Sequence, residues 1–183
     1  MPDEAAELLP VLITQRLKLR CFRVSDAPAL AANLTPAVTR WLATWPDPVS
    51  VELAAERIEL ARASVAAGWH VSYAIERLSD GVVIGGFGGG TADDGADLID
   101  VGYHLAEHAH GQGYMAEAGR AALAAMWRLL PVQVIEAVAQ RENAASFGVM
   151  RKLGMSPIGQ RLVHSPARDR WEWCGVRAIN RPA

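Results

Sequence analysis

The stretch from His108 to Trp127, HAHGQGYMAEAGRAALAAMW, decides how the chain folds. Gly111 and Gly113 are separated by one residue and lead directly into an apolar pattern of helical spacing, which Pro131 ends. The segment before them, 98–105, has the pattern of a strand. Unpaired N–H groups and the helix dipole at such a helix start attract an anion. The stretch therefore predicts a phosphate-binding turn, or a tight turn that needs glycine for its backbone alone.

Size and composition predict one soluble domain. The chain has 183 residues, of which 51% are hydrophobic, so one sizeable core is expected and a second domain is not. Its 18 Lys and Arg against 20 Asp and Glu exclude nucleic acid as the main ligand. The beginning of the chain lacks a signal-peptide pattern, and no run approaches a membrane span of about 18 apolar residues. We expect a cytoplasmic protein in which Cys21 and Cys174 are buried thiols.

The remaining periodicities predict an alternation of strands and helices around a mixed sheet. A proline-broken loop or helix carries Trp41 and Trp45, and Asp80 with Gly81 marks a hairpin turn. The order is β-α-α-β-β-β-α-β-α-β, one α/β or α+β domain. Strands are expected at 14–22, 69–76, 82–87, 98–105, 132–140 and 171–178, and helices at 27–34, 51–68, 114–129 and 142–154.

The segment GQGYMA also fits the dinucleotide fingerprint G-x-G-x-x-G/A, which makes NAD binding an alternative. That fingerprint belongs near the start of a βαβ unit, with an acidic residue about 20 positions later. Here it follows at least three expected strands. Glu136 lies inside the next strand and Glu142 is too distant. NAD is therefore the weaker alternative.

Two ordered segments resemble a known family. DVGYHLAEHAHGQGYMAEA and, after a strand, ENAASFGVMRKLGM are similar to the acetyl-CoA-binding core of the GNAT acetyltransferases, in the branch of ribosomal-protein N-terminal acetyltransferases. TQRLKLR, IERLSDGVVIGG and WEWCGVRA extend the resemblance from about Ile13 to Ala178 of the single domain 1–183. It implies an α/β (α+β) fold with a mixed, mostly antiparallel sheet flanked by helices, in which two splayed parallel strands bind acetyl-CoA.

The resemblance also implies cofactor-binding residues. The turn that would wrap the CoA pyrophosphate comprises His110, Gly111, Gln112, Gly113, Tyr114 and Met115. His110 stands where the family has Gln or Arg, and Met115 where it has a small residue. Backbone amides should still bind, with a protonated His110 helping to hold a phosphate. The backbone N–H groups of His104 and Leu105 would polarise the thioester oxygen.

Asn143 and Ser146 match the N-x-x-S element of the family. Taken alone, Asn143 is an ordinary helix cap and Ser146 a first-turn residue. Together they imply that Asn143 positions the pantetheine or a water, and that Ser146 donates a hydrogen bond to the leaving sulfur. Many relatives use a tyrosine as this acid. The three tyrosines here all precede the 132–140 strand, which favours Ser146.

The general base and the acceptor stay open. Candidates for the base are Asp100, Glu136 and His164, each also explicable as a surface or strand-edge group. No metal is expected, because His104, His108 and His110 have no second cluster of ligands. The predicted reaction is direct acetyl transfer from acetyl-CoA to a primary amine. A protein N-terminus is the favoured acceptor; small amines such as polyamines or aminoglycosides, and a non-catalytic CoA-binding module, are the alternatives. A homodimer is also left open.

Overall fold

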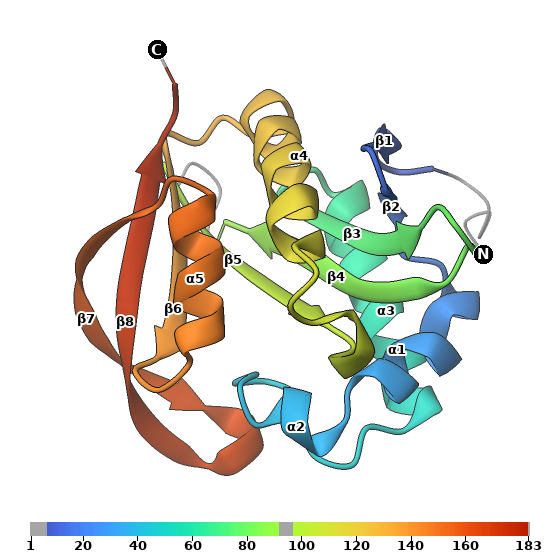
Figure 1. Ribbon diagram of the computed structural model, residues 1–183, viewed down its shortest axis with the longest axis horizontal. Coiled ribbons are helices and arrows are strands. Elements are labelled where there is room, and N and C mark those ends of the chain that lie inside the picture. The colour runs from blue at the N-terminus through green and yellow to red at the C-terminus, as the bar shows by residue number, and fades with distance from the viewer. Residues whose placement is uncertain (1–6, 92–96, 183) are drawn as a thin grey trace.

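The strands of the protein form one eight-stranded sheet in the computed structural model, which describes residues 7–91 and 97–182 (Figure 1). The order across the sheet is β1-β2-β3-β4-β5-β6-β8-β7. Every neighbouring pair is antiparallel except β5 and β6, which confirms the mixed, mostly antiparallel sheet. The strands are β1 (Leu12–Ile13), β2 (Leu17–Cys21), β3 (His70–Arg77), β4 (Val83–Gly90), β5 (Leu98–Leu105), β6 (Val134–Gln140), β7 (Ser156–Ser165) and β8 (Arg170–Asn180).

Helices cover both faces of the sheet (Figure 1). The longer α4 and the shorter α5 lie on one face, above the larger of two buried clusters, which contains Tyr73, Phe87 and Ile99. The second cluster lies on the other face, under α1 and α3, and includes Phe22 and Ile58. The helices are α1 (Ala27–Asn33), α2 (Pro36–Thr39), α3 (Val51–Ala66), α4 (Tyr114–Leu129) and α5 (Ala144–Lys152), with short 3-10 turns at Val24–Asp26, Glu107–Ala109 and Pro166–Arg168.

Helix α4 packs tightly because its inner face consists of small and flexible side chains. Ala118, Ala122 and Met126 have no exposed surface, at the helical spacing that the sequence predicts. Gly119 allows a close approach, since a Cβ atom there would lie 2.9 Å from the Leu153 side chain and 3.3 Å from Phe87. This packing fixes the start of α4 against the sheet, where the glycine turn lies.

The two parallel strands separate partway along their length. β5 and β6 pair from Leu98 with Val134 to Val101 with Ala137. Both strands continue beyond that point, to Leu105 and Gln140, without further pairing to each other. The opening between them is the splay that the family resemblance implies.

Two strands were not predicted. β7 carries Pro157 and Gly159, its register shifts between them, and most of its side chains are exposed, so it has no apolar alternation. His164, predicted in a loop, therefore lies on a strand. The two-residue β1 is too short to show a period. Cys21 and Cys174 are buried free thiols as expected. In the described part of the chain, no helix has the length and apolar character to span a membrane.

Candidate active site

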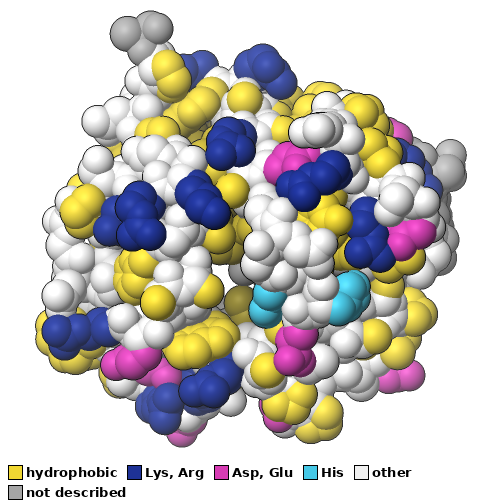
Figure 2. All heavy atoms as spheres, in the orientation of Figure 1, with side chains coloured by type: hydrophobic (Ala, Val, Ile, Leu, Met, Phe, Trp, Pro, Cys, Tyr) yellow, Lys and Arg dark blue, Asp and Glu magenta, His cyan; other side chains and the backbone are white. Residues whose placement is uncertain are grey.

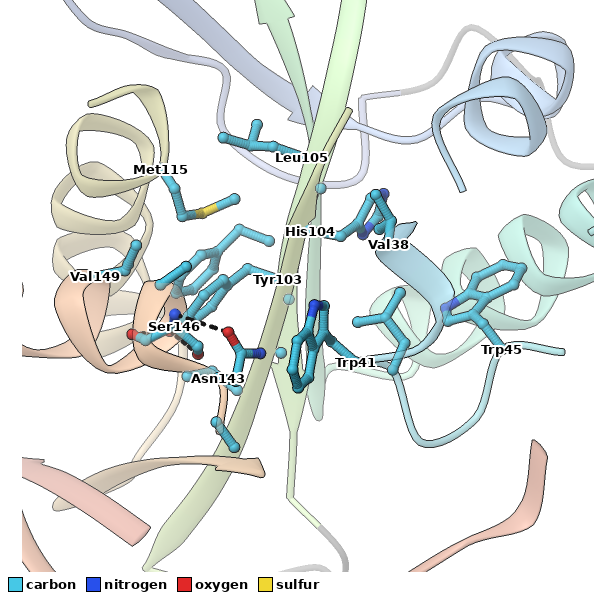
Figure 3. A pocket seen from close by; sticks show the side chains of 18 of the residues that line it. Val38, Trp41, Trp45, Tyr103, His104, Leu105, Met115, Asn143, Ser146 and Val149 are labelled. Carbon is cyan, nitrogen blue, oxygen red and sulfur yellow. Dashed lines mark hydrogen bonds between the residues drawn. The ribbon is translucent and has the colours of Figure 1, made fainter. Parts of the chain in front are cut away.

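A cavity of about 1040 Å³ lies at the opening between β5 and β6 and extends to both faces of the sheet. Figure 2, which views the molecule from the side of α4 and α5, shows the mouth of the cavity as a hollow near the centre, bordered by apolar and histidine side chains. In Figure 3, Tyr103 and Leu105 of β5 face Met115 and α5, whereas His104 points to the other side, toward Val38. The volume suits a small-molecule site.

The glycine turn before α4 lines this cavity. Gly111 and Gly113 have φ angles of 73° and 83°, in the left-handed region where glycine is favoured. Gly113 is the N-cap of α4 and offers no side chain to the first turn, in which the amide of Glu117 donates to the Gly113 carbonyl at 3.1 Å. The amides ahead of Glu117 are therefore left for a ligand. A Cβ added at Gly111 would have no atom of the described residues within 4 Å, so the backbone is accessible there.

His110 is turned toward the sheet. Its Nε2 donates to the Leu105 carbonyl at 2.9 Å, and Gln112 donates through Nε2 to the His108 carbonyl at 2.8 Å. These bonds tie the turn to itself and to the end of β5. An anion at this turn would consequently be held mainly by backbone amides, with His110 shaping the turn.

Met115 lines the cavity from the first turn of α4. Its side chain is buried and points toward β5 from the first turn of α4 (Figure 3). Tyr114, beside it, is also buried and lines the cavity. The cavity keeps its volume with Met115 in place, and the flexible thioether can adapt to a neighbour. The turn and the cavity thus fit a phosphate-bearing ligand with a slender arm.

Asn143 caps α5, as its place in the sequence predicts. Its side-chain oxygen accepts from the backbone amide of Ser146 at 3.1 Å. The amide nitrogen of the same side chain points into the cavity (Figure 3). Capping and ligand contact are therefore compatible, because they use different atoms of one side chain.

The hydroxyl groups of Tyr103 and Ser146 are hydrogen-bonded at 2.9 Å, and the tyrosine also contacts the Ser146 carbonyl at 3.2 Å. Burial raises the pKa of Tyr103 to about 12, so the phenol is neutral at physiological pH. Its ring stacks on Phe87 with centroids 5.6 Å apart. Sequence reasoning missed this residue, since no spacing signals a contact between positions 43 residues apart.

The backbone amides of β5 alternate in direction. Ala106 donates to the Ile84 carbonyl of β4 at 2.8 Å. Because bonding alternates in an antiparallel pair, the amide of His104 also faces β4, whereas those of Tyr103 and Leu105 face the opening toward β6. Of the two amides predicted to polarise a carbonyl oxygen, the one directed into the opening is that of Leu105.

The cavity continues across β5 to the side of α1, α2 and α3. Three glycines of β4 and β5, which have no side chains, line the cavity there and form what we call its glycine floor: Gly86, Gly88 and Gly102. His104 projects from this floor; its Nε2 is buried and has no hydrogen-bond partner among the described residues. Burial lowers the pKa of His104 to about 4. A neutral imidazole thus borders this half of the cavity, with its unpartnered Nε2 buried.

Trp41 and Trp45 form part of the wall on this side. Their segment is tied to the β7–β8 hairpin: the Ser165 hydroxyl and the Ala167 amide both donate to the Ala43 carbonyl, at 3.0 and 3.1 Å. Arg168 adds a bond to the Leu42 carbonyl at 3.0 Å. The wall is thereby held rigidly over the glycine floor.

None of the three predicted bases lines the cavity. Asp100 and Glu136 are paired on adjacent strands, and Arg161 of β7 binds both, at 2.7 and 3.0 Å. His164 is exposed, tilts against Trp171 and lies 3.7 Å from Asp169. A role for any of them in proton transfer would need a relay.

Glu172 is one of two acidic residues, with Glu107, among the described residues that line the cavity. Hydrogen bonds from Arg168, then Arg170 and Gln140, lower its pKa to about 2, although burial acts in the opposite direction. It is ionised and already saturated with partners. Among the residues that the structure describes, no three His, Cys, Asp or Glu side chains are grouped so as to hold a metal ion.

Comparison with known proteins gives a family match and a set of similar folds. Residues 16–156 match the family described as acetyltransferase (GNAT) domain. No curated protein sequence matches the chain. An acetyl transferase of Salmonella typhimurium that modifies the N-terminal serine of ribosomal protein L7/L12 superposes with a TM-score of 0.81 at 17% identity, over 94% of this chain and all of its own.

Two further solved structures have the same fold. Mycobacterium smegmatis RimJ, in complex with CoA-disulfide, superposes with a TM-score of 0.74 at 21% identity, over 90% of this chain and 81% of its own. A GNAT-family acetyltransferase of Bacillus anthracis gives 0.79 at 20% identity, over 93% and 98%. At such identities these likenesses establish the fold.

Proposed function

The chain belongs to the GNAT acetyltransferase family, and we propose that it acetylates a primary amine, favouring the α-amine of a protein N-terminus. The family uses acetyl-CoA as acetyl donor. The observation that carries the proposal is the meeting of three features in one cavity: the open end of β5, the uncapped start of α4, and the Ser146 hydroxyl. Direct transfer in a ternary complex needs these features side by side.

The glycine turn would hold the cofactor by its phosphates. Amides around Gly113 are free of side-chain caps and lie at the positive end of α4. Asn143 presents its amide nitrogen to the cavity for the pantetheine arm or a water. When bound, acetyl-CoA supplies an activated thioester, and the protein supplies its position and its polar surroundings.

Two groups would assist the transfer. The Leu105 amide faces the opening and can donate to the thioester oxygen, where negative charge develops. Ser146 can donate to the departing sulfur when Tyr103, whose hydroxyl also donates to the Ser146 carbonyl at 3.2 Å, acts as the donor in the 2.9 Å bond between the two hydroxyl groups. Tyr103 is thus a positioning residue for Ser146.

The acceptor would lie over the glycine floor, where the charges disfavour a polycation. Glu172 is neutralised by Arg168 and Arg170, and Glu107 accepts a hydrogen bond from Thr35. Arg57 adds a positive charge beside Trp45, at 5.6 Å from its ring. Several carboxylates without cationic partners would favour a polyamine or an aminoglycoside, whereas Glu172 has two arginine partners. A single amine on a neutral or acidic body, such as a protein N-terminus, suits this lining better.

Deprotonation is less demanding for an α-amine than for a lysine. An α-amine with a pKa near 7.7–8.0 is roughly a tenth neutral at pH 7, whereas a lysine has a pKa near 10.4. His104 stays neutral in its buried position and would not repel the incoming amine. We propose that its imidazole contacts the acceptor, and that the proton leaves through water.

Parallel calorimetric titrations with CoA, acetyl-CoA and NAD test the cofactor, and initial rates of thiol release with a peptide, spermidine and an aminoglycoside test the acceptor. Binding of both CoA forms and turnover of the peptide are expected. Binding without turnover of any amine would favour a non-catalytic CoA-binding module. Binding of NAD in place of CoA would refute the proposal.

A further inference from the structure

Arg16, in the turn between β1 and β2, joins the sheet to the start of α4. Its Nη1 donates to the Gln112 carbonyl at 3.0 Å. Its Nε and Nη2 donate to the Glu117 carboxylate at 2.8 and 2.7 Å, and its own backbone amide donates to the same carboxylate at 2.8 Å. The guanidinium also lies 4.4 Å from the centre of the Tyr114 ring. One side chain therefore contacts three residues of the glycine turn and of the first turn of α4.

The bond to Gln112 sets the direction of a peptide plane. The Gln112 carbonyl and the Gly113 amide belong to the same trans peptide, in which C=O and N–H point in opposite directions. Holding the carbonyl on the side of Arg16 directs the N–H of Gly113, which lines the cavity, away from Arg16. Gly113 has no side chain to enforce this orientation and has a φ of 83°. Arg16 supplies the constraint.

The ion pair with Glu117 removes an unfavourable charge. Glu117 lies in the first turn of α4, where its carboxylate would compete with a bound anion for the amides and the helix dipole. Partial burial raises the pKa of Glu117, but hydrogen bonds from Thr14 and Arg16 lower it more, so the carboxylate is ionised. Arg16 neutralises it, and Thr14 holds it at 2.6 Å on the side of the β1–β2 turn.

We propose that Arg16 is a positioning residue for the acetyl-CoA phosphates: it orients the Gly113 amide and holds Glu117 away from the anion. The inference rests on the proposed function, since it assigns the turn to acetyl-CoA. It differs from a purely structural role, because it concerns the affinity of one ligand. The side chain is 41% exposed, so its loss leaves no buried cavity.

The test compares Arg16→Met with Lys18→Met. Lys18 is a matched control: its side chain is 33% exposed, it lies on the adjoining strand and it pairs with Glu76 at 3.5 Å, away from the glycine turn. If Arg16→Met is poorly folded, Arg16→Lys replaces it in the comparison, because lysine keeps the positive charge and lacks the planar fork of the guanidinium. Calorimetry gives the Kd for CoA, thermal unfolding gives the ligand-free Tm, and kcat is measured at saturating acetyl-CoA.

The expected result is a Kd about tenfold higher for Arg16→Met, equivalent to about 1.4 kcal/mol, with kcat within about twofold of the parent. Lys18→Met should leave Kd within about twofold. Adding Glu117→Gln to Arg16→Met should restore part of the affinity, because the uncompensated carboxylate is removed.

Equal Kd values for Arg16→Met and Lys18→Met would overturn the inference and leave the proposed function standing. A lower ligand-free Tm with unchanged Kd would also overturn it, in favour of a purely structural role. Failure of the unaltered protein to bind CoA would refute the proposed function itself, and the inference with it.

Discussion

The hydroxyl oxygens of Tyr103 on β5 and Ser146 on α5 lie 2.9 Å apart, at the point where β5 and β6 separate. The tyrosine ring is fixed by Phe87, with an angle of 8° between the ring planes. The serine is fixed by the cap of α5, through the bond from its amide to Asn143. Two rigid elements thus hold a hydroxyl pair in the proposed acetyl-transfer site.

Removing the hydroxyl groups of Ser146 and Tyr103 separately should lower kcat by different amounts. Ser146→Ala removes the proposed donor to the leaving sulfur and should lower kcat roughly 100-fold. Tyr103→Phe keeps the stacked ring and should lower kcat about tenfold, because Ser146 loses its partner. Steady-state rates at saturating substrates check both, with the Kd for CoA as control. A Ser146→Ala variant with unchanged kcat would rule out this role.

The backbone of the glycine turn should matter for binding more than for stability. Gly113→Ala places a Cβ at a φ of 83°, a conformation that costs a non-glycine residue roughly 1–2 kcal/mol. Gly81→Ala is the matched control, since Gly81 has a φ of 70° in the β3–β4 hairpin. Both variants should lose similar Tm. Calorimetry should show weaker CoA binding for Gly113→Ala and unchanged CoA binding for Gly81→Ala. Equal losses of CoA affinity in the two variants would argue against a binding role for Gly113.

The bare floor near His104 should determine acceptor access. A Cβ at Gly102 would have no atom of the described residues within 4 Å, so the methyl group of Gly102→Ala fits without a clash, and Gly102→Val adds more bulk at the same lining position. The KM for a peptide acceptor should rise in that order, by about tenfold for valine, while the Kd for CoA stays constant. A rise in the CoA Kd with unchanged peptide KM would place the acceptor elsewhere.

His104 should make stability depend on pH. Burial lowers its pKa to about 4 from an ordinary value of 6.5. Between these values the unfolded chain binds a proton that the folded chain does not, so the free energy of unfolding falls as pH drops from about 6.5 to about 4. His104→Phe should flatten this slope in urea titrations. Parallel slopes for the parent and His104→Phe would contradict the assignment.

Local features of the site could be predicted from the sequence. The glycines before α4 and the cap at Asn143 depend on neighbouring residues, and both lie as expected. The pairing of Asp100 with Glu136 across β5 and β6 was not predicted, although both residues were placed on strands. Their partner Arg161 was missed with β7, because that exposed strand has no apolar period.

Contacts between distant segments could not be predicted. Arg16 and Glu117 are 101 residues apart, and Tyr103 and Ser146 are 43 apart. Both contacts depend on how α4 and α5 pack on the sheet. The backbone amide of His104 was predicted to polarise the thioester, but strand alternation turns this amide toward β4. The structure instead places His104 in the lining of the cavity.

The most direct test of the central claim is mass spectrometry of a peptide with a free N-terminus after incubation with the protein and acetyl-CoA. A second peptide, blocked at its N-terminus and carrying an internal lysine, is the comparison. We expect enzyme-dependent acetylation of the first peptide at its α-amine, matched by release of free CoA thiol, and no acetylation of the second. Acetylation of the lysine peptide alone, or of neither peptide despite CoA binding, would contradict it.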